Sequence, residues 1–545
     1  MTMTPPKSKS QIPGVKYQPA VQRGFKRGMG QLVRAIAPTL GPRPRHVVHE
    51  TMFQGRMPEF LDDGATIARR IVALPDRVED AGAMILREML WAVHETAGDG
   101  TATAAVLFGS IYNQGLGFVA AGGNGMLLRR HLEQAAQDLL AEIDRTTRPL
   151  EGKEGVRRFA EGLCHDTDLA EVVAEALDLL GPDGRLDIRP GRDRKLRLEL
   201  FDGVYWDSGL FARDPTAGTD KISLVDPAFL LTDLEIKEPA ELIPALDLAC
   251  QAGINSLVLV AHTVSERALT ILQLPANRQR LNVAAVRAPA NHTSLPDSLA
   301  DMALLVGGQP LLAATGDRLE AVRMENFGGA RRAWADKEYL GLEAGKGDPR
   351  ELRRRLGELR AQLANCHEVE ARTRLRSRIG RLLYGSGVLW IGAATPLALE
   401  ARKETAQRVA EAARGALREG VVAGGGIALL NLKPFLQTKI CAAQSSEERL
   451  AHKILLRAVQ APFRTLLANS GHEPETILAE LAQRPAGHGF DVTRAEYKDL
   501  AAAGIVDSAA VVKAALHHAV ASSALALSID VLVQRANPPM GIQRQ

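Results

Sequence analysis

The pattern of hydrophobic and polar residues divides the chain into helical ends and a middle of mixed character. From Gln18 to about Asp144, apolar residues recur every three or four positions, as in AGAMILREMLWAV and MLLRRHLEQAAQDLLAEI. This spacing predicts amphipathic helices, because residues three and four positions apart share one helix face. Helical periodicity returns after about Tyr384 and is interrupted by the glycine-rich stretch EGVVAGGGIAL.

Short apolar runs of strand length occupy the middle of the chain. Between Leu186 and Gly308 they read LRLELFDG, AFLLTD, SLVLVAH and LNVAAVRAP, and helical pieces such as AELIPALDLACQAG and ERALTILQL separate them. Strands that alternate with helices predict an α/β unit with a central sheet. We therefore expect the two chain ends to build one body into which the middle is inserted as a separate domain.

A strongly charged segment follows this α/β region, from about Asp348 to Tyr384. The run RTRLRSRIGR carries five arginines, but several glutamates lie nearby. Balanced charge of this kind favours a solvated helix pair over a nucleic-acid patch. One apolar seam crosses the charged segment and is formed by Leu352, Leu356, Leu359 and Leu363.

Length and composition exclude several classes of protein. With 545 residues the chain is too long for one hydrophobic core, and about two to four domains are expected. Hydrophobic residues make up 46% and charged residues 24%, as in ordinary soluble proteins, and no apolar run reaches transmembrane length. The net charge of +3 gives no case for nucleic acid. The four scattered cysteines indicate a reducing, cytoplasmic compartment.

The stretch ETAGDGTATAAVL holds the most specific candidate chemistry. Gly98 and Gly100 bracket Asp99 where one helical pattern ends and the next begins. Glycine lets the backbone approach a ligand closely, and a helix start offers free N–H groups to phosphate. An aspartate at this place suits a phosphate that carries Mg²⁺. The stretch predicts a nucleotide-phosphate cradle, although a plain turn between two helices explains it as well.

Four other turns in the helical ends have a similar composition. Each alone is an ordinary turn or helix cap. Together they form the set of close-approach loops and acidic turns that one nucleotide pocket assembled from distant segments would need. They are TLGPRPR from Thr39, LDDGATIARRI with Asp62 and Asp63, VVAGGGIALL with Gly424 to Gly426, and AAAGIVDSAAVVKAAL with Asp507.

The order of these motifs resembles a group I chaperonin of the GroEL type. TLGP, DG, GDGT, EGVVAGGG and GIVD follow one another with few gaps from about Val15 to about Val533, and EGVVAGGG with AGDGT is a strong signature of that family. The short distance from Val15 to TLGP fits the mature bacterial form. The basic N-terminus is therefore interpreted as a short tail before a helix rather than as a transit peptide.

This resemblance implies a multi-domain α and α/β fold. An equatorial ATP-binding domain would comprise residues 1–145 and 419–545, and a small intermediate domain residues 146–201 and 387–418. An apical, client-binding α/β domain, residues 202–386, would be inserted in the middle. The family forms rings of seven subunits, so we expect a homo-oligomer of one or two rings that binds an unfolded or specific client protein. Whether a co-chaperonin lid also binds is left open.

Family roles in the nucleotide pocket pass to this chain through the motifs. Asp99 would bind Mg²⁺, Asp63 would position the attacking water, and Asp507 would hold the ribose hydroxyls. The implied cofactors are ATP and Mg²⁺, with K⁺ as an optional second cation. The implied nucleotide-binding residues are Thr39, Leu40, Gly41, Pro42, Asp99, Gly100, Thr101, Ala102, Thr103, Gly425, Asp491 and Asp507.

The chain departs from the family where the attacking water is activated. Counted back from Gly424 without gaps, Arg408 occupies the place of the aspartate that serves as general base. Arginine stays protonated and cannot take that role. A register shift of one helical turn would bring Glu404 or Glu411 there instead. Because loss of a base slows a reaction by about 10²–10⁴-fold, we expect weak or lost ATP hydrolysis.

Further departures affect the phosphate side and the contacts between subunits. Ala102 replaces a threonine near the phosphates, and Asp62 replaces a lysine. An inter-subunit arginine–glutamate pair has become Ser208 and Pro396. The inter-ring pair of the family is retained as Arg464 and Glu473.

The client groove of the family is altered in this chain. A proline, Pro275, falls inside its second helix, and a proline in a helix interior costs about 3 kcal/mol or ends the helix. The groove should therefore be shorter and more polar. The changed positions are Asp214, Pro215 and Gln273, and the retained apolar ones are Ile243, Leu246, Leu269, Leu272 and Leu274.

Two functions remain open from the sequence. The first is a divergent chaperonin that binds ATP, hydrolyses it slowly or not at all, and assists the folding or assembly of few clients. The alternative is a ring-forming structural or scaffold protein that has lost chaperone activity.

Overall fold

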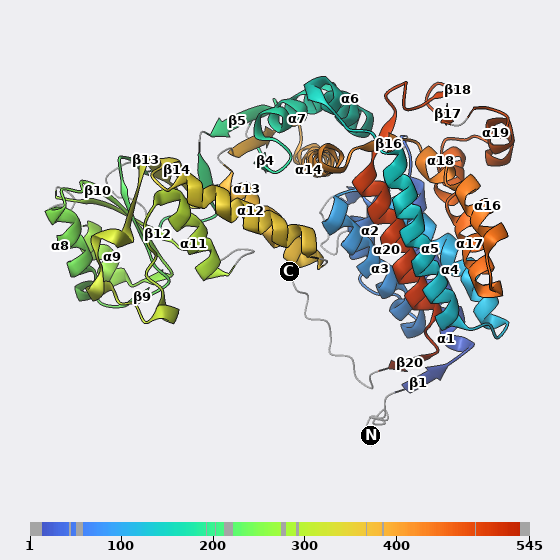
Figure 1. Cartoon of the computed structure of the whole chain (residues 1–545), viewed down its shortest axis with the longest axis horizontal. Helices are drawn as coiled ribbons and strands as arrows, with labels where there is room; N and C mark the ends of the chain where they lie inside the picture. The colour runs from blue at the N-terminus through green and yellow to red at the C-terminus, as the bar shows by residue number, and fades with distance from the viewer. Residues whose placement is uncertain are drawn as a thin grey trace, which may run out of the picture. The chain divides into compact units, whose positions relative to one another are not determined.

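The computed structural model describes residues 14–42, 45–50, 58–191, 193–201, 203–211, 222–273, 280–289, 294–366, 368–383, 386–485 and 487–534. The chain forms two compact units (Figure 1). Unit 1 comprises residues 1–174 and 393–545, and unit 2 comprises residues 175–392. Both chain ends thus build one unit and the middle forms another, as the hydrophobic pattern predicts.

Unit 1 is mostly helical. Its helices are α1 (Ala20–Ile36), η1 (Ala37–Thr39), α2 (Gly64–Arg70), α3 (Arg77–Ala97), α4 (Thr101–Ala120), α5 (Gly125–Thr146), α6 (Gly152–Cys164), α7 (Thr167–Leu180, which runs into unit 2), α14 (Pro396–Glu419), α15 (Ile427–Leu430), α16 (Lys433–Ala442), α17 (Ser446–Ala458), α18 (Ala461–Asn469), α19 (Pro474–Leu481) and α20 (Ala509–Leu527). Its short strands are β1 (Gly14–Tyr17), β2 (Val47–His49), β3 (Glu59–Leu61), β16 (Val421–Ala423), β17 (His488–Asp491), β18 (Glu496–Asp499), β19 (Val506–Ser508) and β20 (Val531–Gln534).

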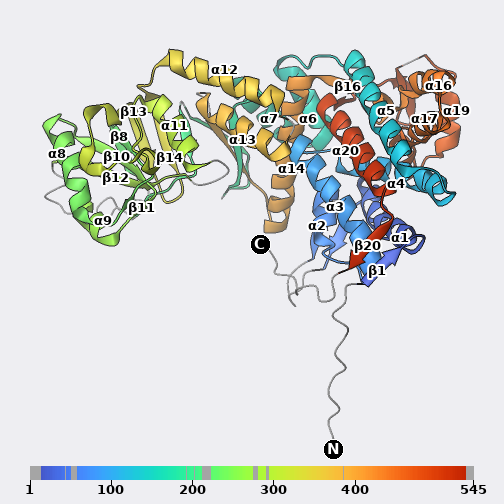
Figure 2. The same ribbon diagram turned by 60° about the horizontal axis from the view of Figure 1, so that its bottom comes forward.

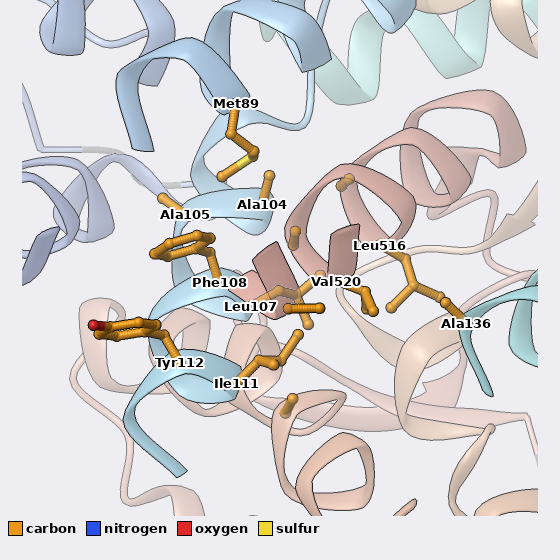
Figure 3. Close-up of a cluster of buried hydrophobic side chains, with 14 of the residues drawn as sticks. Met89, Ala104, Ala105, Leu107, Phe108, Ile111, Tyr112, Ala136, Leu516 and Val520 are labelled. Carbon is orange, nitrogen blue, oxygen red and sulfur yellow. The ribbon is translucent and has the colours of Figure 1, made fainter. Parts of the chain in front are cut away.

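The core of unit 1 lies between α3, α4, α5 and α20, which pack side by side (Figures 1 and 2). Figure 3 shows Leu107 and Ile111 of α4 pointing toward Val520 of α20. Both helices are rich in alanine, so their backbones can approach closely. Because α4 and α20 come from opposite ends of the sequence, neither end can bury its apolar face without the other.

Helix ends in unit 1 follow capping rules. The carboxylate of Asp76 accepts N–H groups of Val78 and Glu79 at 2.8 and 3.1 Å, and so begins α3. The side chain of Asn124 caps α5 in the same way. The first and last described strands also meet, since β1 pairs antiparallel with β20.

Unit 2 contains the α/β elements. Its strands are β4 (Arg185–Pro190), β5 (Arg197–Phe201), β6 (Val204–Trp206), β7 (Ile222–Val225), β8 (Ala228–Leu231), β9 (Glu235–Ile236), β10 (Ser256–Ala261), β11 (Thr263–Val264), β12 (Asn282–Arg287), β13 (Phe327–Ala335), β14 (Leu340–Gly345) and β15 (Ser386–Ile391). Its helices are η2 (Pro239–Leu242), α8 (Ile243–Gln251), α9 (Glu266–Gln273), α11 (Leu295–Val306), η3 (Ala313–Thr315), η4 (Leu319–Ala321), η5 (Met324–Asn326), α12 (Pro349–Asn365) and α13 (Val369–Leu382).

Among the described residues of unit 2, the largest sheet has the order β12-β10-β8-β13-β14-β6, with β7 also paired to β13. Alternate residues of β10 face opposite sides, as a pleated strand requires. Leu257 and Leu259 pack toward α8 and α9, whereas Val258 and Val260 pack toward α11. Figure 1 shows these helices on the two faces of the sheet.

The charged segment forms the predicted helix pair, α12 and α13. Leu356 and Leu359 of the predicted seam are buried, and Leu352 and Leu363 pack against the same core. Arg378 of α13 donates two hydrogen bonds of 2.8 Å to Asp301 of α11. The arginine-rich run therefore places a buried cation, Arg378, in an ion pair within unit 2.

Within the described part of the chain, α20 is long and apolar enough to cross a membrane by length and composition. More than half of its apolar stretch is buried inside unit 1, as is usual for a core helix of a soluble protein. Its position between α4 and α5 explains its composition without a membrane.

Candidate functional site

The turn between α3 and α4 holds the predicted phosphate cradle. Gly98 directly follows α3 and Gly100 directly precedes α4, and both lie in the left-handed region with φ of +71° and +86°. A Cβ on Gly98 would lie 2.5 Å from that of Glu411, and one on Gly100 would lie 2.7 Å from Cγ1 of Val511. Only glycine fits this turn, so the free N–H groups at the start of α4 stay accessible at close range.

Asp99 lies between these two glycines. Its carboxylate accepts the N–H of Gly100 at 2.7 Å. Burial raises the pKa of Asp99, the Arg408 guanidinium opposes that rise, and the nearby carboxylates of Asp63 and Asp62 add to it. A carboxylate short of positive charge in this way is a suitable place for a cation.

Asp63 is fixed at the start of α2. Its Oδ2 accepts the N–H and the hydroxyl of Thr66 at 2.8 and 2.9 Å, and its Oδ1 accepts the hydroxyl of Thr101 at 3.0 Å. The hydroxyl oxygen of Thr101 in turn accepts the N–H of Gly64 at 3.1 Å. Thr101 thus ties the start of α2 to the start of α4, and both oxygens of Asp63 are engaged.

Arg408 of α14 reaches the same acidic cluster. Its Nη2 donates to Oδ2 of Asp62 at 3.2 Å, and the two side chains are 21% and 28% exposed. Burial opposes the charge of the guanidinium, but Asp99, Asp62 and Asp63 outweigh it, so the pKa of Arg408 is raised. The gap-free count placed Arg408 at this cluster, and the structure has it there.

The two glutamates considered as substitutes lie on either side of Arg408 on α14. Burial, then Glu400 and the carboxylates of Asp62 and Asp63, raise the pKa of Glu404. Glu411 forms an ion pair with Arg414 on its own helix and packs against Gly98. Glu404 therefore faces the acidic cluster, whereas Glu411 borders the glycine turn.

Asp507 and the three glycines form another wall of the cluster. Val422 and Asp507 are partners in the β16–β19 pair, and Gly424 donates its N–H to the carbonyl of Ile505 at 3.0 Å. Burial and the charge of Asp99 raise the pKa of Asp507 to about 7, and a backbone hydrogen bond from Gly426 opposes the rise. The effect of Asp99 on this pKa shows that the two carboxyls are near each other although 408 positions separate them in the chain.

The TLGP segment follows α1 in η1 and the turn after it. Thr39 is buried, and its hydroxyl donates to the carbonyl of Ile36 at 2.8 Å. The side-chain amide of Asn469 donates to the carbonyls of Ala37 and Leu40, both at 2.8 Å. Gly41 has a φ of +113°, and Pro42 follows half-buried. Asn469 thus holds this loop from α18.

Four other predicted nucleotide-binding residues lie in regular helix, turn or strand positions. Ala102 and Thr103 lie in the first turn of α4, half-buried. Gly425 has a φ of +64° beside Gly426. Asp491 ends β17, where hydrogen bonds from Lys498 and Thr493 overcome burial and lower its pKa to about 2. The carboxylate of Asp491 is engaged within the β17–β18 hairpin, and its role toward a nucleotide stays a prediction.

These residues fit a magnesium nucleotide. The cradle offers close glycine backbone, a helix start and the carboxylate of Asp99, and a Cβ at Gly64, Gly98 or Gly100 would meet neighbouring atoms within 3 Å. Among the described residues, no group of three or more His, Cys, Asp or Glu side chains could hold a metal alone. Mg²⁺ commonly binds through one or two carboxylates together with phosphates and water, so the donor set suits a metal that arrives with its nucleotide.

Sequence reasoning missed three features of this site. Asn469 and Thr66 hold the loops but belong to no recognised motif. The third is the pairing of Asp62 with Arg408, because each substitution by itself reads as an independent departure from the family. Their opposite charges, exchanged relative to the lysine and aspartate of the family, were the signal that could have predicted the contact.

The predicted client-binding residues lie in unit 2. Between α8 and α9 a groove of about 270 Å³ is lined by Ile243, Leu246 and Leu272, with Asp247 and Arg280 adding charge. Leu269 packs half-buried against the same core. Helix α9 ends at Gln273. Leu274, Pro275, Asp214 and Pro215 lie outside the described residues.

Two of the residues predicted at subunit contacts, Arg464 and Ser208, have partners within the chain. Arg464 forms an ion pair with Glu475, and Glu473 precedes the first residue of α19. Ser208 is buried and donates to the carbonyl of Arg287. Pro396 is the first residue of α14. The inter-ring role of Arg464 and Glu473 stays a prediction.

Comparison with known proteins identifies the family. The model of the TCP-1/cpn60 chaperonin family matches residues 32–277 and 352–537, so the chain belongs to this family. Its structure resembles the chaperonin gp146 from bacteriophage EL 2 (Pseudomonas aeruginosa), crystallised in the presence of ATP-BeFx. In crystal form I the TM-score is 0.74 at 17% identity, covering 96% of this chain and 99% of that one. Crystal form II gives a TM-score of 0.67 with the same identity and coverage. The predicted chaperonin fold and family are thereby confirmed.

Proposed function

We propose that this member of the TCP-1/cpn60 chaperonin family binds Mg-ATP in unit 1 and assists the folding or assembly of a restricted set of client proteins, with slow ATP hydrolysis. The observation that carries the proposal is the convergence of Asp99, Gly100 and Asp507 at one acidic cluster. Asp507 lies 408 positions after Asp99 in the chain. In addition, the structural relative gp146 was crystallised with an ATP analogue.

Each residue of the cluster has a defined task in this proposal. The N–H groups at the start of α4 and the hydroxyl of Thr103 bind phosphate, and Asp99 holds Mg²⁺, which neutralises phosphate charge when it is bound. Asp507 binds the ribose hydroxyls. Asp63, held by Thr66 and Thr101, orients water near the terminal phosphate. Arg408 supplies a positive charge to that phosphate.

The wider assembly follows the family. Residues 1–145 with 419–545 form the equatorial domain, residues 146–201 with 387–418 the intermediate domain, and residues 202–386 the apical domain. Seven such subunits form a ring in the cytoplasm, and the groove between α8 and α9 binds the client. The four cysteines are free, which agrees with a reducing compartment.

Calorimetric titration with Mg-ATP tests the proposal. Wild-type protein should bind, and Asp99→Ala should weaken Mg-ATP binding at least tenfold because it removes the metal ligand. Glu88→Ala, an exposed site on α3, is the matched control and should leave affinity unchanged. If wild-type protein forms rings but binds no ATP, the scaffold alternative replaces this proposal.

A further inference from the structure

Asp62 and Arg408 form one exchanged ion pair rather than two separate losses. Where the resemblance places a lysine and an aspartate, this chain has an aspartate and an arginine, and the structure joins them through a 3.2 Å hydrogen bond. The positions are 346 residues apart in the chain. The positive charge that is absent at position 62 is therefore present at position 408, and the negative charge that is absent at position 408 is present at position 62.

The three carboxylates of the cluster differ in how strongly they are engaged. Both oxygens of Asp63 accept hydrogen bonds, from Thr66 and Thr101. Asp99 accepts the N–H of Gly100 and is the predicted metal ligand. Asp62 accepts its hydrogen bond from Arg408 on a separate, long helix. Since an arginine can turn toward a phosphate as readily as toward a carboxylate, the bond to Asp62 is the one that can be exchanged.

We propose that Asp62 is the general base of this chaperonin and that Arg408 restrains it until nucleotide is bound. This inference rests on the proposed ATP-binding function. When Arg408 turns to the terminal phosphate, the carboxylate of Asp62 is freed beside the water that Asp63 orients. Asp62 then accepts a proton from that water while the water oxygen forms a bond to the terminal phosphorus.

One bond forms to the terminal phosphorus in this step and one bond to it breaks. The bond between the terminal phosphorus and its bridging oxygen breaks, and its electron pair stays with the departing diphosphate. Asp62 afterwards gives the proton to solvent. The base is thus supplied by the segment before α2, and α14 supplies the cation, which reverses the arrangement that the family resemblance implies.

A binding cycle tests the exchange without relying on turnover. Asp62→Asn should free Arg408 and tighten Mg-ATP binding about two- to fivefold, the range expected for a partly exposed ion pair. Arg408→Gln should weaken it. In the Arg408→Gln background, Asp62→Asn should have no further effect, because the partner is already gone. Binding of Mg-ADP, which lacks the terminal phosphate, should be unchanged by Asp62→Asn.

If Asp62→Asn has the same effect on Mg-ATP affinity with and without Arg408, the exchange is refuted even though the nucleotide site stands. Absence of Mg-ATP binding by the wild type would instead refute the proposed function. Calorimetry on the assembled full-length protein therefore separates the two failures.

Turnover then identifies the base. Asp62→Asn should lower the hydrolysis rate about 10²–10⁴-fold. Arg408→Asp alone adds another carboxylate to the cluster and should not raise the rate above that of the wild type. Asp62→Lys combined with Arg408→Asp restores one base and one cation, and its hydrolysis rate should exceed that of either single variant. Glu404→Gln should keep the wild-type rate. If Glu404→Gln abolishes hydrolysis while Asp62→Asn does not, Glu404 is the base and our assignment is wrong.

Discussion

The acidic cluster in unit 1 and the apolar groove in unit 2 differ in what fixes their residues. Around Asp99 the backbone is packed so tightly that a Cβ on Gly98 or Gly100 would overlap a neighbour. In the groove, Ile243 is 52% exposed, and Asp247 and Arg280 line it without being enclosed. The glycine motif is therefore held by packing as well as by ligand chemistry, whereas the exposed side chains of the groove, such as Ile243, are not fixed by packing.

This difference affects how the motifs should be interpreted. Retained glycines show that the turn is kept, and they would be retained in a protein that no longer hydrolyses ATP. The informative positions are the side chains that packing does not dictate, Asp62 and Arg408 in unit 1 and Asp247 and Arg280 in unit 2.

The largest expected effect tests whether tight packing fixes the glycine turn around Asp99. Gly100→Ala should destabilise unit 1 by about 3 kcal/mol and abolish ATP binding, because it adds left-handed strain and overpacking against Val511. Gly122→Ala is the matched control, since Gly122 also has positive φ, +90°, but no atom lies within 4 Å of its added Cβ. Thermal unfolding and calorimetry should show a small effect for Gly122→Ala, and equal effects of both variants would contradict the packing argument.

Next in size is a pair of substitutions within the groove. Leu272 is 4% exposed, so Leu272→Ala should lower the stability of unit 2 by about 2–3 kcal/mol. Ile243→Ser should leave the melting temperature nearly unchanged but weaken binding of an unfolded model protein. Melting curves and client co-sedimentation separate the two effects. Client binding that survives Ile243→Ser would place the client elsewhere.

An effect of similar size depends on the titration of Asp507. Its folded-state pKa of about 7 lies above the usual value for aspartate, so the folded protein binds more protons than the unfolded chain between about pH 4 and 7. Stability without nucleotide should therefore fall as pH rises through this window and level off above it. Asp507→Asn should remove about 2–3 kcal/mol of this dependence between pH 5 and pH 8.

Melting temperatures at pH 5 and pH 8 provide the measurement. Asp507→Asn should also weaken nucleotide binding through the ribose, while Asp168→Asn, on an exposed site of α7, should do neither. An unchanged pH dependence in Asp507→Asn would show that another group titrates.

The smallest expected effect concerns assembly. Arg464→Ala should change ring-to-ring association by about 0–1 kcal/mol, since exposed ion pairs contribute little. Glu475→Gln removes the partner within the chain and is the control. Light scattering over a concentration series should show more dissociation for Arg464→Ala alone. Equal behaviour of the two variants would mean that the arginine acts inside the subunit.

The sequence predicts local structure well and long-range contacts poorly. Helical ends, the α/β middle and the seam through Leu356 and Leu359 follow from periodicity, which depends on neighbours in the chain. The order of the large sheet, with β13 beside β8, does not, because register between distant strands leaves no local signal. The contacts of Asn469 with TLGP and of Arg408 with Asp62 could not be predicted for the same reason, because both join distant parts of the chain. The motif residues were predictable through resemblance, but their partners were not.

The dependence of α4 on α20 has a consequence for synthesis. The helix α4 ends at Ala120 and its partner α20 begins at Ala509. At about 5–20 residues per second, the apolar face of α4 remains without its partner on the ribosome for about 20–80 s. Unit 2, a continuous segment that ends at Gly392, can fold during that wait. During synthesis of this chaperonin-family protein, the apolar face of α4 therefore has to be kept from aggregating until α20, the last of the described helices, has been made.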